Sequence, residues 1–335
     1  MRTVYVTHQA ATIRREGGVI AVNVKGARVA QVSVHDLSQL VVMGNVVLTP
    51  AALDLLVEKG VDTVFLTHSG RYRGRITHGL SGSVKLRLSQ YDMLCDPASA
   101  LDTARNIVAA KIANMRVFLL RFSRRRGRTE RQQRSLASML ASAARLDLAA
   151  TLDEVRGCEG SATASYFRCF GDAIEAEGFS FDGRNRRPPL DPVNALLSLG
   201  YTLLANTVEA AVNVVGLDPY VGTLHAVEAN RPSLVCDLEE EFRAVVVDAV
   251  VVAAINKRVM QQGDFEDAGP GEPVFIRREA VSRFVGLIER RLRSPVTYEP
   301  QGVRLAWRQV IEQQVRAFAR FVLGTAERYE PYRAR

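Results

Sequence analysis

Short runs rich in valine and threonine dominate the first eighty residues, and Gly or Asn separates several of them. Runs of this kind are typical of β-strands. One helix is expected between the last two runs, with Thr49 as its cap, Pro50 as its first residue and Gly60 as its stop. RYRGRIT then predicts a hairpin or an edge strand that carries Arg71, Arg73 and Arg75. We expect strands at TVYVT, GVIAVNV, ARVAQVSV, LVVMG, NVVLT and VDTVFLT.

From about Pro97 the spacing changes, and apolar residues recur every three or four positions through nearly all of the remaining chain. This spacing predicts helices. One of these begins near Asp237 and continues through LEEEFRAVVVDAVVVAAINKRVM. The fold class is therefore α+β, with a small N-terminal β-rich domain followed by a larger all-α domain. We place the β domain at residues 1–84, a linker at 85–97 and the helical domain at 98–335.

Composition is consistent with a soluble globular protein of about two domains, since the chain has 335 residues and 47% of them are hydrophobic. The four cysteines form no CxxC pair, which argues against a disulfide framework or a zinc site. The N-terminus lacks the apolar core of a signal peptide, and the most apolar run, residues 244–254, is too short to span a bilayer. We expect a soluble, cytoplasmic protein with no membrane partner.

The net charge of +8 is unevenly distributed along the chain. Residues 1–150 hold 22 Lys and Arg against 10 Asp and Glu, whereas the remainder holds 22 against 26. A basic half favours a polyanionic partner, because neutralising phosphates releases counterions. The alternative is a general bias toward arginine, since only five of the 44 basic residues are lysine.

Two segments could carry chemistry together. In the first, His225 precedes a dense acidic cluster, of which Asp237, Glu240 and Glu241 would share one helix face. The alternative is an ordinary acidic first turn, solvated and favourable to the helix dipole. In the second, Glu159 lies among small residues in CEGSATASYF, where a ligand with its metal could approach closely. There the alternative is a helix–helix contact with Glu159 in solvent.

Two arginine-rich segments are candidates for phosphate contact, although each could equally be a solvated loop. Arg186 and Arg187 crowd the loop before a helix that Asp191 caps and Pro192 begins. The run RFSRRRGRTERQQR includes Arg121, Arg124 and Arg125. The sequence contains no Gly-rich phosphate loop, no Ser/His/Asp order and no HExxH motif.

Four motifs in order resemble the CRISPR adaptation integrase, the family that inserts spacers into CRISPR arrays. They are EGSATASYF, RRPPLDPVNALLSLGYTLL, GTLH followed by RPSLVCDLEEEFR, and the closing stretch from DFEDAGPGEPV to AERYEPYRAR. The resemblance covers most of residues 100–335, and it makes the helical domain the catalytic one. Thr163 and Thr223 depart from the family pattern without removing a ligand.

The resemblance implies that Glu159, His225 and Glu240 are catalytic metal ligands, with Asp237 as a further ligand or as a neighbour that supports them. Carboxylates plus one imidazole suit Mg²⁺ or Mn²⁺. The implied reaction is attack by the 3′-OH of a captured DNA fragment on a phosphodiester at a CRISPR repeat. Tyr166, Asn194 and Tyr201 match family positions near the site.

The implied partners are double-stranded DNA, a second copy of the chain joined through the β domain, a small dimeric CRISPR adaptation protein and, in some systems, an iron–sulfur exonuclease. Two other functions stay open. One is a stand-alone metal-dependent nuclease that acts on branched or single-stranded DNA, and the other is a non-catalytic DNA-binding scaffold.

Overall fold

A computed structural model describes residues 2–76, 83–123, 127–186, 188–266, 269 and 271–335. Two sheets form the N-terminal domain. One has the strand order β1-β5-β7-β8 and the other has the order β4-β3-β2-β6. The strands are β1 (Thr3–Val6), β2 (Ala11–Glu16), β3 (Val19–Val24), β4 (Ala27–Ser33), β5 (Gln39–Met43), β6 (Val46–Leu48), β7 (Asp62–Leu66) and β8 (Tyr72–Ile76).

The predicted local signals around these strands are confirmed. The side chain of Thr49 caps α1 (Pro50–Glu58), and β8 is the edge strand that RYRGRIT indicated, antiparallel to β7. β2 was not predicted, because Arg14 and Arg15 interrupt its apolar pattern, although Ala11 and Ile13 are fully buried.

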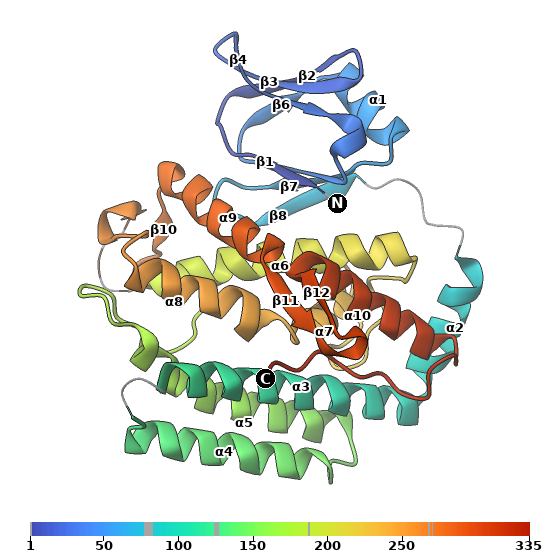
Figure 1. The fold of residues 1–335 in the computed structure, drawn as a ribbon, viewed down its shortest axis with the longest axis vertical. Coiled ribbons are helices and arrows are strands. Elements are labelled where there is room, and N and C mark those ends of the chain that lie inside the picture. The colour runs from blue at the N-terminus through green and yellow to red at the C-terminus, as the bar shows by residue number, and fades with distance from the viewer. Residues whose placement is uncertain (1, 77–82, 124–126, 187, 267–268, 270) are drawn as a thin grey trace.

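Nine α-helices and one π-helical segment build most of the second domain within the described residues. In Figure 1, α3, α4 and α5 form a layer at the end opposite the β domain, and α6, α8 and α9 lie between. The helices are α2 (Val84–Cys95), α3 (Pro97–Ser123), α4 (Glu130–Leu146), α5 (Leu152–Phe170), α6 (Pro192–Val215), α7 (Ser233–Glu239), the π-helix η3 (Arg243–Asp248), α8 (Ala249–Asn256), α9 (Arg278–Arg293) and α10 (Trp307–Val322).

Three expectations for this half need correction. The segment 85–97, expected as a linker, is mostly the helix α2. Two short hairpins, β9–β10 and β11–β12, interrupt the helices, so α10 begins at Trp307 and not at Val303. These strands are β9 (Phe265–Glu266), β10 (Phe275–Ile276), β11 (Pro295–Tyr298) and β12 (Val303–Ala306).

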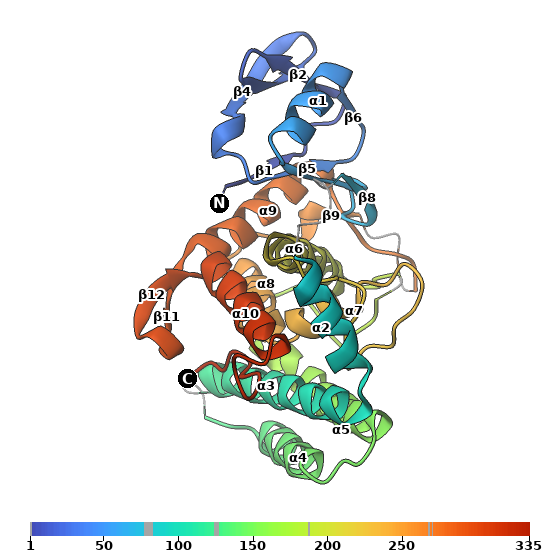
Figure 2. The same ribbon diagram turned by 90° about the vertical axis from the view of Figure 1, so that its right-hand side faces the viewer.

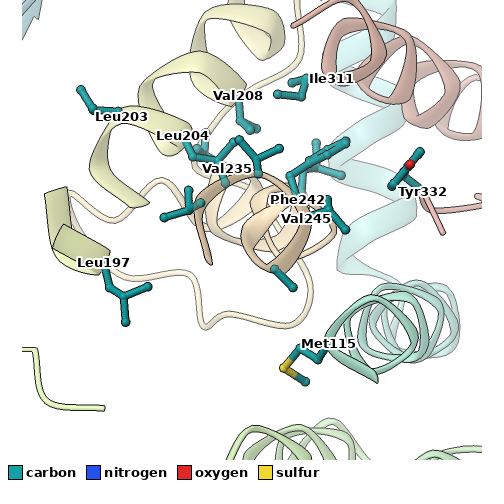
Figure 3. Packing of buried hydrophobic residues seen from close by; sticks show 14 of the residues in the cluster. Met115, Leu197, Leu203, Leu204, Val208, Val235, Phe242, Val245, Ile311 and Tyr332 are labelled. Atoms are coloured by element: carbon teal, nitrogen blue, oxygen red, sulfur yellow. The ribbon is translucent and has the colours of Figure 1, made fainter. Parts of the chain in front are cut away.

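The central helix α6 forms the middle of the helical core. Asp191 caps it as predicted, because its side chain accepts from the Asn194 N–H, and Pro192 is the first helical residue. The helix is long and apolar enough to cross a membrane, but 67% of its most apolar window is buried inside the protein. Figure 3 shows its Leu204 and Val208 beside Val235 of α7. The length and apolarity of α6 therefore follow from its place in the core.

Polar contacts fasten the β domain to the helical domain, which Figure 2 shows in side view. Arg75 of β8 forms ion pairs with Asp62 and with Glu209 of α6. Tyr5 donates a hydrogen bond to Glu289 of α9 at 3.0 Å. Because the Arg75 side chain is only 4% exposed, this contact is an ordered interface and not a loose tether.

Candidate metal centre

Helix α5 carries Glu159 near its middle. Thr151 caps this helix through a hydrogen bond from the Glu154 N–H. Thr163, one turn after Glu159, donates to the Glu159 carboxylate at 2.9 Å. The side chain of Glu159 is 25% exposed. The carboxylate is therefore oriented by its own helix while one edge faces solvent.

The loop before α7 holds His225, and Asp237 organises this loop. One Asp237 oxygen accepts from the Thr223 N–H at 2.6 Å and from the Leu224 N–H at 3.1 Å. The other accepts from the His225 N–H at 3.0 Å and lies 2.7 Å from His225 Nδ1. Hydrogen bonding at Nδ1 fixes the ring orientation and leaves Nε2 as the nitrogen able to ligate.

Glu240 lies in the turn that separates α7 from η3. Its carboxylate is 2.7 Å from Arg243 Nη1 and 2.7 Å from Lys111 Nζ of α3. Burial alone would raise the pKa of Glu240, but the charges of Arg243 and Lys111 lower it to about 2. Glu240 is therefore a buried carboxylate that stays ionised.

Lys111 joins the two predicted carboxylate ligands, because its ammonium group also forms an ion pair with Glu159. Arg156, one turn before Glu159, donates to the Leu224 carbonyl at 2.8 Å and so holds the His225 loop against α5. Within the described ranges, no three His, Cys, Asp or Glu side chains converge as a ready-made metal cluster. The structure thus brings Glu159 and Glu240 to one lysine and holds the His225 loop against the helix that carries Glu159.

Burial rules out a solvated acidic edge for the cluster after His225. Asp237 and Glu241 are 0% exposed, and Glu239 and Glu240 are 3% exposed. The helix begins at Ser233 and not near Asp237, and it stops at Glu239. The expectation of one shared face is also wrong, because Glu241 points to Tyr329 and Gln314 whereas Glu240 points to Lys111 and Arg243.

Comparison with known proteins decides the family. Residues 4–290 match the family model described as CRISPR associated protein Cas1. A CRISPR-associated endonuclease Cas1 of Thermus thermophilus is 38% identical over 99% of this chain and 97% of its own length. A Cas4 exonuclease/Cas1 endonuclease fusion of Geobacter sulfurreducens is 33% identical, and the match covers 97% of this chain and 59% of the fusion.

The chain belongs to the Cas1 family. The family resemblance that the four motifs indicated is confirmed. Among solved structures, a Cas1 protein from Thermotoga maritima is 26% identical with a TM-score of 0.84, and the match covers 97% of each chain. A casposase bound to an integration product has a TM-score of 0.88 at 22% identity over 100% of this chain and 95% of its own, which shows the shared fold.

Tyr166 and Tyr201 meet at one buried carboxylate in this Cas1-family chain. Both hydroxyl groups donate to Asp248 at 2.6 Å, one to each oxygen. The guanidinium of Arg243 lies 4.9 Å from the centre of the Tyr201 ring, so this cluster adjoins Glu240 through Arg243. Asn194 is fully buried and holds the preceding loop by donating to the Gly183 carbonyl at 2.9 Å.

Asp248 predicts a measurable dependence of stability on pH. Burial raises its pKa to about 6 from an ordinary 3.8, and the tyrosine hydrogen bonds and the charges of Arg243 and Arg184 oppose the rise. A raised pKa in the folded state stabilises the protein below the unfolded pKa, and this contribution is lost as pH rises toward 6. Relative to Asp248→Asn, the wild type should lose about 3 kcal/mol of unfolding free energy between about pH 4 and pH 7. Urea unfolding at several pH values measures this, and parallel profiles for the two proteins would contradict it.

The predicted phosphate-contacting arginines lie at different distances from Glu240. Arg186 is exposed and lines the same small cavity as Lys111 and Glu240. Arg121 lies ten residues beyond Lys111 on α3, about 15 Å along the helix. Arg124, Arg125 and Arg187 fall outside the described residues.

The sequence patterns did not indicate Lys111 or Arg243 as site residues, and they gave Asp248 no role at the site. Lys111 and Arg243 contact the predicted ligands, and Asp248 anchors the two tyrosines. The signal for Lys111 was present in the sequence, because IVAAKIANM places a single lysine within an apolar helical run. A charge on a buried helix face requires a partner.

Asp237 offers a test of how His225 is oriented. Its carboxylate accepts from backbone N–H groups as well as from the His225 ring, and asparagine would supply only one acceptor oxygen. Asp237→Asn should weaken Mn²⁺ binding by about 10- to 100-fold, which titration calorimetry can measure. Asp218→Asn is the matched control. Asp218 lies in the same segment between α6 and α7, where it accepts from the Tyr91 hydroxyl and the Tyr220 N–H and does not contact His225. Equal affinities in the two variants would refute the role of Asp237.

Proposed function

We propose that this protein is a metal-dependent DNA integrase that inserts captured DNA fragments into a CRISPR array, with Glu159, His225 and Glu240 as ligands of Mg²⁺ or Mn²⁺. The observation that carries the proposal is that Glu159 and Glu240 share one cationic partner, Lys111, while Arg156 ties the His225 loop to the same helix as Glu159. Membership of the Cas1 family, whose relatives include CRISPR-associated endonucleases, supports it.

The donor set fits a hard divalent cation. Two carboxylates and one imidazole supply oxygen and nitrogen donors with no thiolate, which suits Mg²⁺ or Mn²⁺. Such an ion would polarise the scissile phosphate and stabilise the leaving oxygen. The low pKa of Glu240 keeps that carboxylate ionised, as a metal ligand must be. Asp237 orients the His225 ring and is proposed as its support, not as a further ligand.

The proposed reaction exchanges one phosphodiester bond for another. The 3′-OH of the captured fragment attacks a phosphodiester of the repeat, the new P–O bond forms, and the old leaving oxygen departs as a 3′-hydroxyl. Water in place of the 3′-OH would give a nuclease. On the protein side, Arg186 at the rim of the site and Arg121 further along α3 are the proposed phosphate contacts.

Partners are proposed from the family. A chain of a solved Cas6-RT-Cas1–Cas2 complex is 25% identical with a TM-score of 0.85, and the match covers 98% of this chain and 36% of that chain. We therefore propose a Cas2 protein as the small partner, together with double-stranded DNA and a homodimer formed through the β domain. The Cas4 fusion relative makes an iron–sulfur exonuclease a further proposed partner.

The test of this function is strand transfer by the wild-type protein. A short duplex with 3′-OH ends is mixed with a supercoiled plasmid that carries a CRISPR repeat, with the small partner protein and either Mn²⁺ or EDTA. Covalent joining in Mn²⁺ but not in EDTA is the expected result. Cleavage without joining would favour the stand-alone nuclease, and a DNA mobility shift without any covalent change would leave a binding scaffold.

A further inference from the structure

The turn that carries Glu240 contacts a part of the chain that is distant in sequence. Glu241, its neighbour, is fully buried and directs its carboxylate away from Lys111. This carboxylate accepts from the Tyr329 hydroxyl, from the Tyr332 N–H at 2.7 Å and from Gln314 Nε2 at 3.2 Å. Gln314 belongs to α10, whereas Tyr329 and Tyr332 belong to the segment 329–334, here named the closing segment. Two donors from the closing segment therefore fix the Glu241 carboxylate to it.

Asn114 of α3 joins the same turn to the same segment. Its amide nitrogen donates to the Glu241 carbonyl at 2.8 Å and to the Tyr332 carbonyl at 2.9 Å. Its oxygen accepts from the Ala334 N–H at 2.8 Å. Lys111, one helical turn earlier, contacts Glu240. Helix α3 therefore contacts Glu240 through Lys111 and Glu241 through Asn114.

Aromatic packing makes the closing segment part of the core. The Tyr332 ring stacks on Phe242 with centroids 5.8 Å apart and meets Trp307 edge-on at 5.2 Å. Tyr329 meets Phe318 edge-on at 5.1 Å and is only 1% exposed. In Figure 3, Phe242 lies between the side chains of α6 and Tyr332. In Figures 1 and 2 the end of the chain lies against α3.

We propose that the closing segment positions Glu240 for metal binding, with Tyr329 and Asn114 as positioning residues that act through Glu241. This inference rests on the proposed metal site. Glu240 lies in a turn between a helix that ends at Glu239 and a π-helix that begins at Arg243, so it lacks the support of a continuous α-helix. Ligands need a fixed geometry, which their outer partners supply. Here residues nearly ninety positions away in sequence supply it.

The test measures Mn²⁺ binding by the intact protein, using the electron paramagnetic resonance signal of free Mn²⁺. Tyr329→Phe keeps the ring and removes the hydroxyl that donates to Glu241. We expect its Mn²⁺ affinity to fall about 10-fold. Tyr5→Phe is the matched control, because it removes a tyrosine hydrogen bond to Glu289 at the domain interface. Its Mn²⁺ affinity should equal that of the wild type, although both variants lose stability.

A second measurement needs no variant. Because coupling between two sites is reciprocal, Mn²⁺ should slow hydrogen exchange at the Tyr332 and Ala334 amides of the wild type. Unchanged affinity in Tyr329→Phe, or unchanged exchange at both amides while the wild type binds Mn²⁺, would overturn the positioning role alone. A wild type that binds no Mn²⁺, or whose binding survives Glu240→Ala, would overturn the proposed function and the positioning role with it.

Discussion

Replacing Glu159 with glutamine is expected to slow strand transfer by about 10³-fold or more. Glutamine keeps the size of the side chain and still accepts the hydrogen bond from Thr163, but it removes the negative charge that faces Lys111. Loss of an outer partner of a metal ligand already costs about 10- to 100-fold, so loss of a ligand charge should cost more. The rate of covalent joining in Mn²⁺ is the measurement.

Glu154→Gln is the matched control for this effect. Glu154 lies on the same helix and is exposed, one and a half turns before Glu159. Its variant should join DNA at the wild-type rate, and melting curves should show that both variants are folded. If Glu159→Gln kept more than about a tenth of the wild-type rate, the proposed ligand set would be wrong. If both variants were equally slow, the loss would reflect general damage to α5.

Much of the fold could be read from the sequence, because local signals dominated there. Valine-rich runs specified most strands of the β domain, and Asp191 with Pro192 specified the start of α6. Where a buried pattern carried charged residues, the prediction failed. Arg14 and Arg15 concealed β2, whose buried residues Ala11 and Ile13 lie on one face of the strand.

The candidate site was only partly readable for a related reason. The family resemblance implied Glu159, His225 and Glu240 as ligands, but tertiary contacts determine what surrounds them. The run LEEEFRAVVVDAVV is typical of one continuous helix. The α-helix nevertheless ends at Glu239, where Glu240 and Glu241 turn toward different partners. Those partners come from α3 and from the closing segment, which no local pattern around residue 240 could reveal.

Replacing Lys111 with methionine is expected to lower the unfolding free energy substantially. Lys111 is only 5% exposed, and its ammonium forms ion pairs with two carboxylates, those of Glu159 and Glu240. Lys111→Met removes this charge while keeping most of the side-chain volume. Breaking a buried ion pair from one side typically costs about 3–5 kcal/mol. The cost here should be at the lower end of this range, because Arg243 still pairs with Glu240 and the Glu159 side chain is partly exposed. In EDTA, we therefore expect Lys111→Met to lose about 3 kcal/mol of unfolding free energy in urea titrations.

Adding Mn²⁺ should affect the stability of Lys111→Met and of the wild type differently. A divalent cation supplies the positive charge that lysine supplies in its absence, so Mn²⁺ should raise the melting temperature more in Lys111→Met than in the wild type. Lys257→Met is the control, because Lys257 is exposed at the end of α8 and its loss should change the unfolding free energy by less than about 0.5 kcal/mol. A Lys111→Met protein as stable as wild type in EDTA would mean that the two carboxylates need no cation besides Arg243. Equal Mn²⁺ shifts would mean that lysine and metal do not act at the same position.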